Sequence, residues 1–147
     1  MEFGLYQHFK GKFYLALDTA KHSETLEEMV VYQSLYGNFD SWVRPKKMFE
    51  EDILTEDGIK APRFRYVSPI EDDDSEDELL MVFDNEKDLK EAVSALENEG
   101  IDCSVQREKF DPKPAYLKSD LFLKIFVNED DFEDAMDVFN PSTPNQP

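Results

Sequence analysis

Hydrophobic and polar positions alternate with a period of two in several short stretches of the first 70 residues. In residues 12–17, Phe13 and Leu15 fall on one side while Tyr14 falls on the other, which is typical of a strand with two different faces. Residues 29–36 are rich in β-branched and aromatic side chains and form a second expected strand. The two runs are expected to pair.

More strands are expected from Trp42 onward and over residues 63–67, with a helical turn over residues 47–53 between them. Pro45 restricts the strand that begins at Trp42 to an edge or an end. Several short strands within one small region predict a strongly bent sheet, either SH3-like or a partly open barrel. The first half of the chain is therefore expected to be β-rich.

Residues 79–139 show a different pattern, in which a strand and a helix alternate and the arrangement occurs twice. The stretch from Leu79 aligns with the stretch from Phe122, and each contains a helical stripe at positions i, i+3, i+4 and i+7. Asn85 and Asn128 are matching N-cap candidates, and Gly100 is placed to end the first helix. With a strand over residues 101–106, the order is β-α-β-β-α, an incomplete ferredoxin-like layout, so the chain is assigned to the α+β class.

An acidic run separates the two patterns. Residues 71–78 read EDDDSEDE and are expected to form an extended linker. The predicted division is therefore a β-barrel-like module over residues 1–70, this linker, a β-α-β-β-α module over residues 79–139, and a disordered tail over residues 140–147. The second module lacks a last strand, so its open sheet edge predicts a weak homodimer.

Charge is distributed unequally between the halves. The chain carries a formal net charge of −18, from 16 Lys and Arg against 34 Asp and Glu, and such a surface disfavours general nucleic-acid binding. Residues 1–70 hold 9 basic and 11 acidic side chains, whereas residues 71–147 hold 7 and 23. The first half alone is therefore able to accept an anion or a nucleotide.

Cysteine content and hydropathy point to the cytoplasm. Cys103 is the only cysteine, which excludes an intrachain disulfide and a cysteine-based zinc cluster. No signal-peptide pattern opens the sequence and no apolar stretch is long enough to span a membrane, so no membrane partner is expected. The sequence also has no phosphate-binding or dinucleotide glycine motif and no spacing of metal ligands, so no cofactor is expected.

Five segments of the first half resemble the bacterial domain-of-unknown-function family 1653. They are Tyr6 with His8 to Gly11, then residues 21–25 (KHSET), residues 31–37 (VYQSLYG), residues 42–49 (WVRPKKMF), and residues 62–64 (PRF). The resemblance covers about residues 3–70 and implies a small β-rich bacterial domain without an assigned activity. The second half is weakly similar to small ferredoxin-like bacterial proteins regarded as signal-transducing.

Polar and aromatic residues of the first half are the candidate site. A ligand groove needs aromatic walls and a few fixed donors, and Arg44 is suited to hold a carboxylate or phosphate. The alternative is that the aromatic side chains only form the core. The candidate ligand-binding residues are His8, Lys21, His22, Ser23, Glu24, Tyr32, Tyr36, Trp42 and Arg44. Three of them, Arg44, His22 and Trp42, are expected to share one exposed hollow.

These observations favour a non-enzymatic binding or regulatory protein whose partner is a small anionic ligand, a peptide or a protein. A hydrolase or transferase acting on an anionic substrate, with His22 or His8 as base, is the first alternative. Catalysis by His22 together with Ser23 is disfavoured, because neighbouring residues on a strand point to opposite faces. Nucleotide or nucleic-acid recognition by the first half is the second alternative.

Overall fold

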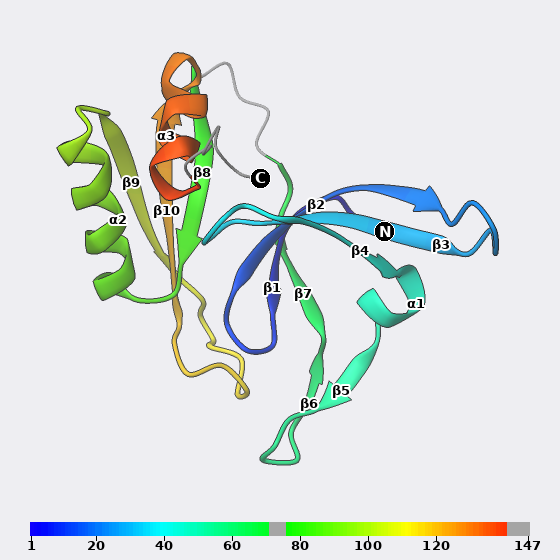
Figure 1. Ribbon diagram of the computed structural model, residues 1–147. Helices are drawn as coiled ribbons and strands as arrows, with labels where there is room; N and C mark the ends of the chain where they lie inside the picture. Colours follow the sequence, from blue (N-terminus) through cyan, green and yellow to red (C-terminus); the bar gives the residue numbers. More distant parts are fainter. Residues whose placement is uncertain (71–75, 141–147) are drawn as a thin grey trace.

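The structure is a computed structural model that describes residues 1–70 and 76–140. It contains ten strands, three α-helices and one 3-10 turn within that part of the chain (Figure 1). The first half holds β1 (Gly4–His8), β2 (Phe13–Lys21), β3 (Glu28–Ser34), β4 (Ser41–Pro45), α1 (Lys46–Phe49), β5 (Asp52–Leu54), β6 (Lys60–Pro62) and β7 (Phe64–Ser68). The second half holds β8 (Asp77–Phe83), α2 (Glu86–Asn98), β9 (Cys103–Lys109), β10 (Leu121–Asn128), η1 (Glu129–Asp131) and α3 (Phe132–Phe139).

The first half is built on a five-stranded antiparallel sheet in the order β4-β3-β2-β1-β7, with β5 and β6 pairing separately. The predicted pairing of the first two hydrophobic runs is confirmed, because β2 pairs with β3. The helical turn expected over 47–53 is partly wrong. Only Lys46–Phe49 is helical, and Ile53 lies in β5 opposite Ala61. Residues 52–54 pair with residues 60–62 across the turn that contains Gly58.

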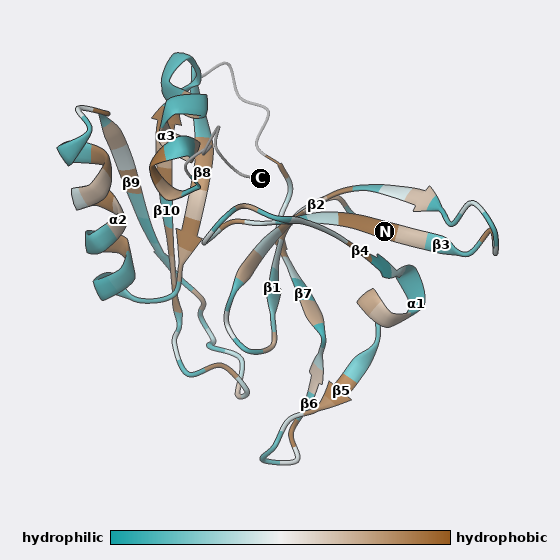
Figure 2. Cartoon of the chain, viewed as in Figure 1, coloured by the Kyte–Doolittle hydropathy of each residue, from teal (hydrophilic) through white to brown (hydrophobic). Residues whose placement is uncertain are grey.

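The second half is a three-stranded antiparallel sheet in the order β8-β10-β9, and its element order is β8-α2-β9-β10-α3. The apolar stripes of both helices pack on this sheet. In Figure 2 the hydrophobic residues of these elements appear as brown segments of the cartoon. Asn85 caps α2 by accepting a hydrogen bond from the Asp88 amide, as predicted. Asn128 caps η1, the turn that precedes α3, and Gly100 follows the end of α2 with a φ of +73°. The α+β class and the β-rich first half are therefore confirmed.

The two halves share a hydrophobic core, which the sequence did not predict. Leu5, Phe13 and Leu35 from the first half pack with Val82 from β8 in one buried cluster. The backbone amide of Val82 also donates a hydrogen bond to the carbonyl oxygen of Leu35 at 3.3 Å. The face of the first sheet that bears Phe13 is therefore covered by the second half, and its opposite face is the one available for a site.

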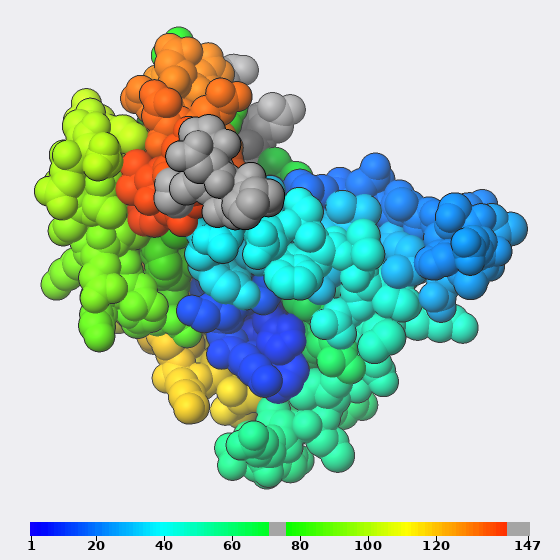
Figure 3. Space-filling model, viewed as in Figure 1, coloured from blue at the N-terminus to red at the C-terminus, as the bar shows by residue number. Residues whose placement is uncertain are grey.

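The turn between β3 and β4 reaches furthest into the second half. Phe39 from this turn is only 6% exposed and belongs to the same core cluster as Leu123 and Ile125 of β10. Its ring lies 6.3 Å from that of Phe139 in α3, and Asn140 donates a side-chain hydrogen bond to the carbonyl oxygen of Asn38. Figure 3 shows this cyan turn against the red surface of α3.

The predicted division into domains stays a prediction, with one observation at its boundary. Of the acidic run 71–78, residues 71–75 lie outside the described residues, whereas Asp77 and Glu78 belong to β8 and pair with Asn128 and Val127. The two carboxylates are exposed, so the strand accommodates them without burying charge. The expected tail lies outside the described residues except for Asn140.

Candidate functional site

Strand register brings aromatic and polar side chains onto one face of the first sheet. Tyr6 pairs with Tyr14, Tyr14 with Ser34, and Tyr32 with Trp42 across successive strands. Because alternate residues of a strand share a face, one face collects the residues at these positions and at the positions two away. We call this set the aromatic face, and its members are Tyr6, His8, Tyr14, Tyr32, Trp42, Arg44 and Phe64.

One end of the aromatic face is a packed core. Phe49 from α1 stacks on Phe64 at 4.3 Å between ring centroids, and both rings are buried. Tyr6 and Tyr32 contact Phe49 edge to face at 5.1 and 5.4 Å. Such pairs stabilise a core beyond the area that they bury. Burial, followed by the charge of Tyr66 and two carboxylates, raises the pKa of Tyr6 to about 12. The core interpretation thus holds for this end of the face.

The other end carries exposed polar atoms and basic side chains. Tyr36, from the turn after β3, shares a hydrogen bond with Tyr14 at 2.6 Å between the hydroxyl oxygens. Burial and this hydrogen bond raise the pKa of Tyr14, so its hydroxyl stays protonated at neutral pH. The ammonium group of Lys12 lies 5.0 Å from the centroid of the Tyr36 ring. One hydroxyl of this pair is therefore still able to donate a hydrogen bond beside a cation.

His8 sits between the packed end and the polar end of the aromatic face. Its ring lies 5.0 Å from Phe64, and its Nδ1 atom accepts a hydrogen bond from the amide of Lys10 at 3.2 Å. Burial, followed by the positive charges of Lys10, Arg44 and Arg63, lowers the pKa of His8 to about 4. With this pKa the histidine is neutral at pH 7.

Arg44 is the cation best placed to bind a ligand. Its Nε atom donates to the Tyr32 hydroxyl at 3.4 Å, and its guanidinium carbon lies 5.8 Å from the Phe64 ring centroid. Within residues 1–70 and 76–140, no carboxylate forms an ion pair with Arg44, in contrast with Arg63, which pairs with Glu51, and Arg107, which pairs with Glu86. The terminal guanidinium nitrogens of Arg44 therefore keep their hydrogen-bonding capacity.

Trp42 lies two residues before Arg44 on β4 and shares its face. The indole is 48% exposed, and its Nε1–H donates to the hydroxyl of Ser34 at 2.9 Å. Because the only polar atom of the indole is bonded to the protein, its exposed part is the apolar carbon surface. Trp42 thus exposes apolar carbon surface on the same strand face as Arg44.

The predicted site residues separate into two groups. His8, Tyr32, Tyr36, Trp42 and Arg44 come together at the aromatic face, although the rings of Tyr32 and Phe64 are mainly core. The second group lies at the turn that joins β2 and β3, and all four members are exposed: Lys21, His22, Ser23 and Glu24.

The expectation that His22 shares a hollow with Trp42 and Arg44 is wrong. The Nδ1 atom of His22 accepts hydrogen bonds from the amides of Glu24 and Thr25 at 3.2 and 3.3 Å, so the imidazole orders its own turn. In Figure 1 this turn forms the far tip of the β2–β3 hairpin, beyond α1. The two strands carry the residues of this turn away from the paired segment that contains Trp42 and Arg44.

The aromatic face includes three residues that are not among the nine candidates, Tyr6, Tyr14 and Phe64. The alternation in residues 12–17 already placed Tyr14 opposite Phe13, and Tyr6 and His8 alternate in the same way on the neighbouring strand. Combining these two patterns would have placed Tyr14 in the site. Phe64 had no comparable signal, because its position depends on β7 pairing with β1 across 56 residues of chain.

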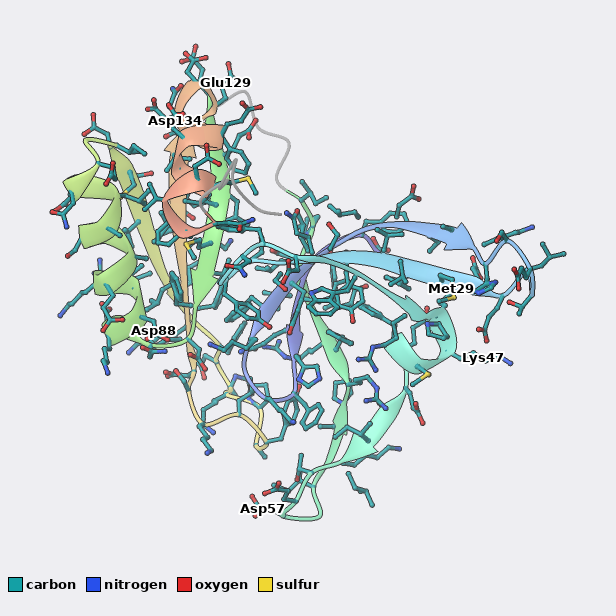
Figure 4. The ribbon with its side chains drawn as sticks, in the orientation of Figure 1. Met29, Lys47, Asp57, Asp88, Glu129 and Asp134 are labelled. Atoms are coloured by element: carbon teal, nitrogen blue, oxygen red, sulfur yellow. The ribbon has the colours of Figure 1, made fainter. Side chains whose placement is uncertain are left out.

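Acidic residues gather mostly on the other half. Figure 4 labels Asp88, Glu129 and Asp134 on the α2 and α3 side of the molecule, whereas Met29 and Lys47 lie near α1.

Between the halves, a small open hollow is lined by residues such as Lys12, Tyr36, Asp84 and Asp88. Within the described ranges, no three His, Cys, Asp or Glu side chains are grouped to hold a metal ion, and no helix is long and apolar enough to cross a membrane.

Comparison with known proteins identifies the first half. A model of the family described as "Protein of unknown function (DUF1653)" matches residues 4–66. A crystal structure of a DUF1653 protein from Bordetella bronchiseptica is 36% identical, with 50% of this chain and 95% of that chain covered and a TM-score of 0.44. The chain belongs to the DUF1653 family. The curated proteins contain no match.

Membership confirms the family resemblance of the first half and agrees with an uncharacterised function. The DUF1653 match includes the aromatic face from Tyr6 to Phe64 and also the β2–β3 turn. It ends before β8, so the resemblance of the second half to ferredoxin-like signal-transducing proteins stays a prediction. The family carries no assigned activity, and a function for this chain must be argued from the geometry of the aromatic face.

Proposed function

We propose that this DUF1653 protein is a non-enzymatic binding module that recognises an anionic group at the polar end of its aromatic face. The observation that carries the proposal is the guanidinium of Arg44, which is held by the Tyr32 hydroxyl at 3.4 Å but has no carboxylate partner in the described part of the chain. An arginine in this state can make two parallel hydrogen bonds to a carboxylate or a phosphate.

Local electrostatics support an anion despite the total charge of −18. The three charges that act on His8 are those of Lys10, Arg44 and Arg63, and of these Arg63 pairs with Glu51. Charges beyond about 10 Å are largely screened at physiological salt, so the acidic second half contributes less than these near cations. A compact anion therefore meets a favourable local potential.

The state of His8 favours binding over catalysis. A general base works best when its pKa lies near the operating pH, and the pKa of His8 is lowered to about 4. A neutral imidazole in this position still donates a hydrogen bond through Nε2, which suits an anion acceptor. His22, the other candidate base, belongs to the distant turn.

The finer fold assignments are also proposals. We propose that the first half is a partly open, SH3-like barrel, because β5 and β6 extend beside the bent five-stranded sheet. We propose a ferredoxin-like layout without its last strand for the second half, supported by the β8-β10-β9 order. A weak homodimer through an open edge of this half is the associated partner proposal, although the hydrogen bond from Val82 to Leu35 occupies part of the β8 edge.

Calorimetric titration with inorganic phosphate and with acetate at low ionic strength tests the anion site. We expect binding by the wild type and at least a tenfold loss in Arg44→Gln, since hydrogen bonds to charged groups contribute about 1.5–3 kcal/mol. Arg107→Gln is the matched control, because it removes an exposed arginine that already pairs with Glu86. Equal binding by the two variants, or no binding by the wild type, would refute the proposal. Turnover in a phosphatase or esterase screen would favour the enzyme alternative.

A further inference from the structure

The residues near Arg44 indicate which chemical group is attached to the anion. Trp42 stands two residues away on the same strand and face, and strands rise about 3.3 Å per residue, so the two side chains leave β4 roughly 7 Å apart. The indole is 48% exposed with its N–H bonded to Ser34. Trp42 and Arg44 therefore leave the same face of β4 two positions apart, with the indole N–H bonded to Ser34 and the Arg44 Nε bonded to the Tyr32 hydroxyl.

We propose that the aromatic face binds a nucleoside monophosphate, with the base stacked on Trp42 and the phosphate held by Arg44. This inference rests on the proposed anion site and adds the chemistry that the anion must carry. Every nucleobase has a planar π-surface that stacks on an aromatic side chain. A nucleoside monophosphate holds its phosphate one sugar away from the base, which fits two side chains that are separated along a strand. In an aromatic acid such as benzoate, the anion sits directly on the ring.

The charges along the aromatic face also suit such a ligand. The packed end, with Tyr6 and Phe49, is near the carboxylates of Glu2 and Glu50, which act on Tyr6. The polar end has the positive charges that act on His8. A phosphate is therefore attracted to Arg44 and to the other cations that act on His8.

Total charge favours a single nucleotide over a nucleic acid. A polymer brings a phosphate every few ångströms and must neutralise several of them with cations. Only the cations near His8 are available on this face, and the chain as a whole carries −18. Arg44 and the neighbouring cations can neutralise one phosphate, whereas the further phosphates of a nucleic acid would lie beyond these cations.

Isothermal titration of the full chain at low salt with four probes tests the inference: adenosine monophosphate, ribose 5-phosphate, adenosine and inorganic phosphate. We expect adenosine monophosphate to bind on the order of tenfold more tightly than ribose 5-phosphate, from the stacked base. Trp42→Leu should remove this advantage while ribose 5-phosphate binds as before, and Trp42→Phe should restore much of it. Because the ribose 5-phosphate affinity is read in the same variant, misfolding is distinguished from a lost stacking surface.

The outcomes separate this inference from the proposed function. Equal binding of adenosine monophosphate and ribose 5-phosphate overturns the nucleotide inference and leaves the anion site standing. Adenosine that binds as well as its monophosphate overturns both, since the phosphate then contributes nothing. An oligonucleotide that binds more tightly per site than the monophosphate, with affinity falling steeply in salt, overturns the inference in favour of nucleic-acid recognition.

Discussion

Truncating Phe39 tests whether the two halves unfold as one unit. This side chain comes from the β3–β4 turn of the first half but is buried in the core of the second half, 6% exposed and 6.3 Å from Phe139. Phe39→Ala leaves a cavity there, and removal of a buried phenylalanine typically costs about 3–5 kcal/mol. The φ of +55° at this position is as unusual for alanine as for phenylalanine, so the backbone contributes little to the difference.

Urea unfolding followed by two probes measures the effect. Trp42 is the only tryptophan and reports on the first half by fluorescence, whereas the far-ultraviolet helix signal comes mainly from α2 and α3 of the second half. We expect both transitions to shift together by about 3–5 kcal/mol, because the cluster of Leu5, Phe13, Leu35 and Val82 joins the sheets.

Phe3→Ala is the matched control for this experiment. It removes the same side chain from a position that is 40% exposed, and it is expected to change stability by only about 0.5 kcal/mol. A shift of the helix signal in Phe39→Ala without a shift of the fluorescence would show that the halves unfold independently. A loss below about 1 kcal/mol by both probes would show that Phe39 does not stabilise the interface.

Three other predictions concern single groups. Asn85→Ala should lower the free energy of unfolding by about 1 kcal/mol, because it removes the acceptor for the Asp88 amide at the start of α2. Thermal unfolding measures this loss, and Ser94→Ala on the exposed side of the same helix controls for helix propensity. Gly4→Ala should destabilise the protein by roughly 2 kcal/mol or more, because φ is +138° and a Cβ atom would lie 2.4 Å from a β7 carbonyl oxygen. Gly37→Asn should be tolerated, because φ is +58° there and no atom lies within 4 Å of the added Cβ. The pKa of His8 is lowered to about 4 in the folded protein, so the unfolded chain binds the extra proton between pH 6.5 and 4 and stability falls as the pH falls through that window. His8→Gln should lose less stability than the wild type over the same window in urea unfolding, and parallel losses would contradict the shifted pKa.

The distribution of charge between the halves is compatible with the proposed anion site despite the net charge of −18. The acidic side chains labelled in Figure 4 on the second half lie around α2 and α3, while the basic groups near His8 come from the first half. The second half covers the opposite face of the first sheet, through contacts such as Val82 with Phe13. Its packing therefore leaves the aromatic face free while fixing the strands that present Trp42 and Arg44.

The sequence by itself determined most of the elements, several of their ends and the side of a strand on which a residue lies. Period-two alternation separated Tyr14 from Phe13, the i, i+3, i+4 stripes defined α2 and α3, and Asn85 was correctly placed as a cap. These features depend on interactions between residues close in the chain, which a local pattern contains. Five motif segments were enough to place the first half in its family.

Only the tertiary structure decided which of these residues meet. His22 was grouped with Arg44 by residue type, but the hairpin carries it to a distant tip where its imidazole orders the turn. Phe39 and Tyr36 stand three residues apart, yet one enters the second core and the other meets Tyr14. Contacts of this kind join segments far apart in sequence, so they depend on how strands register and sheets pack, which no local period encodes.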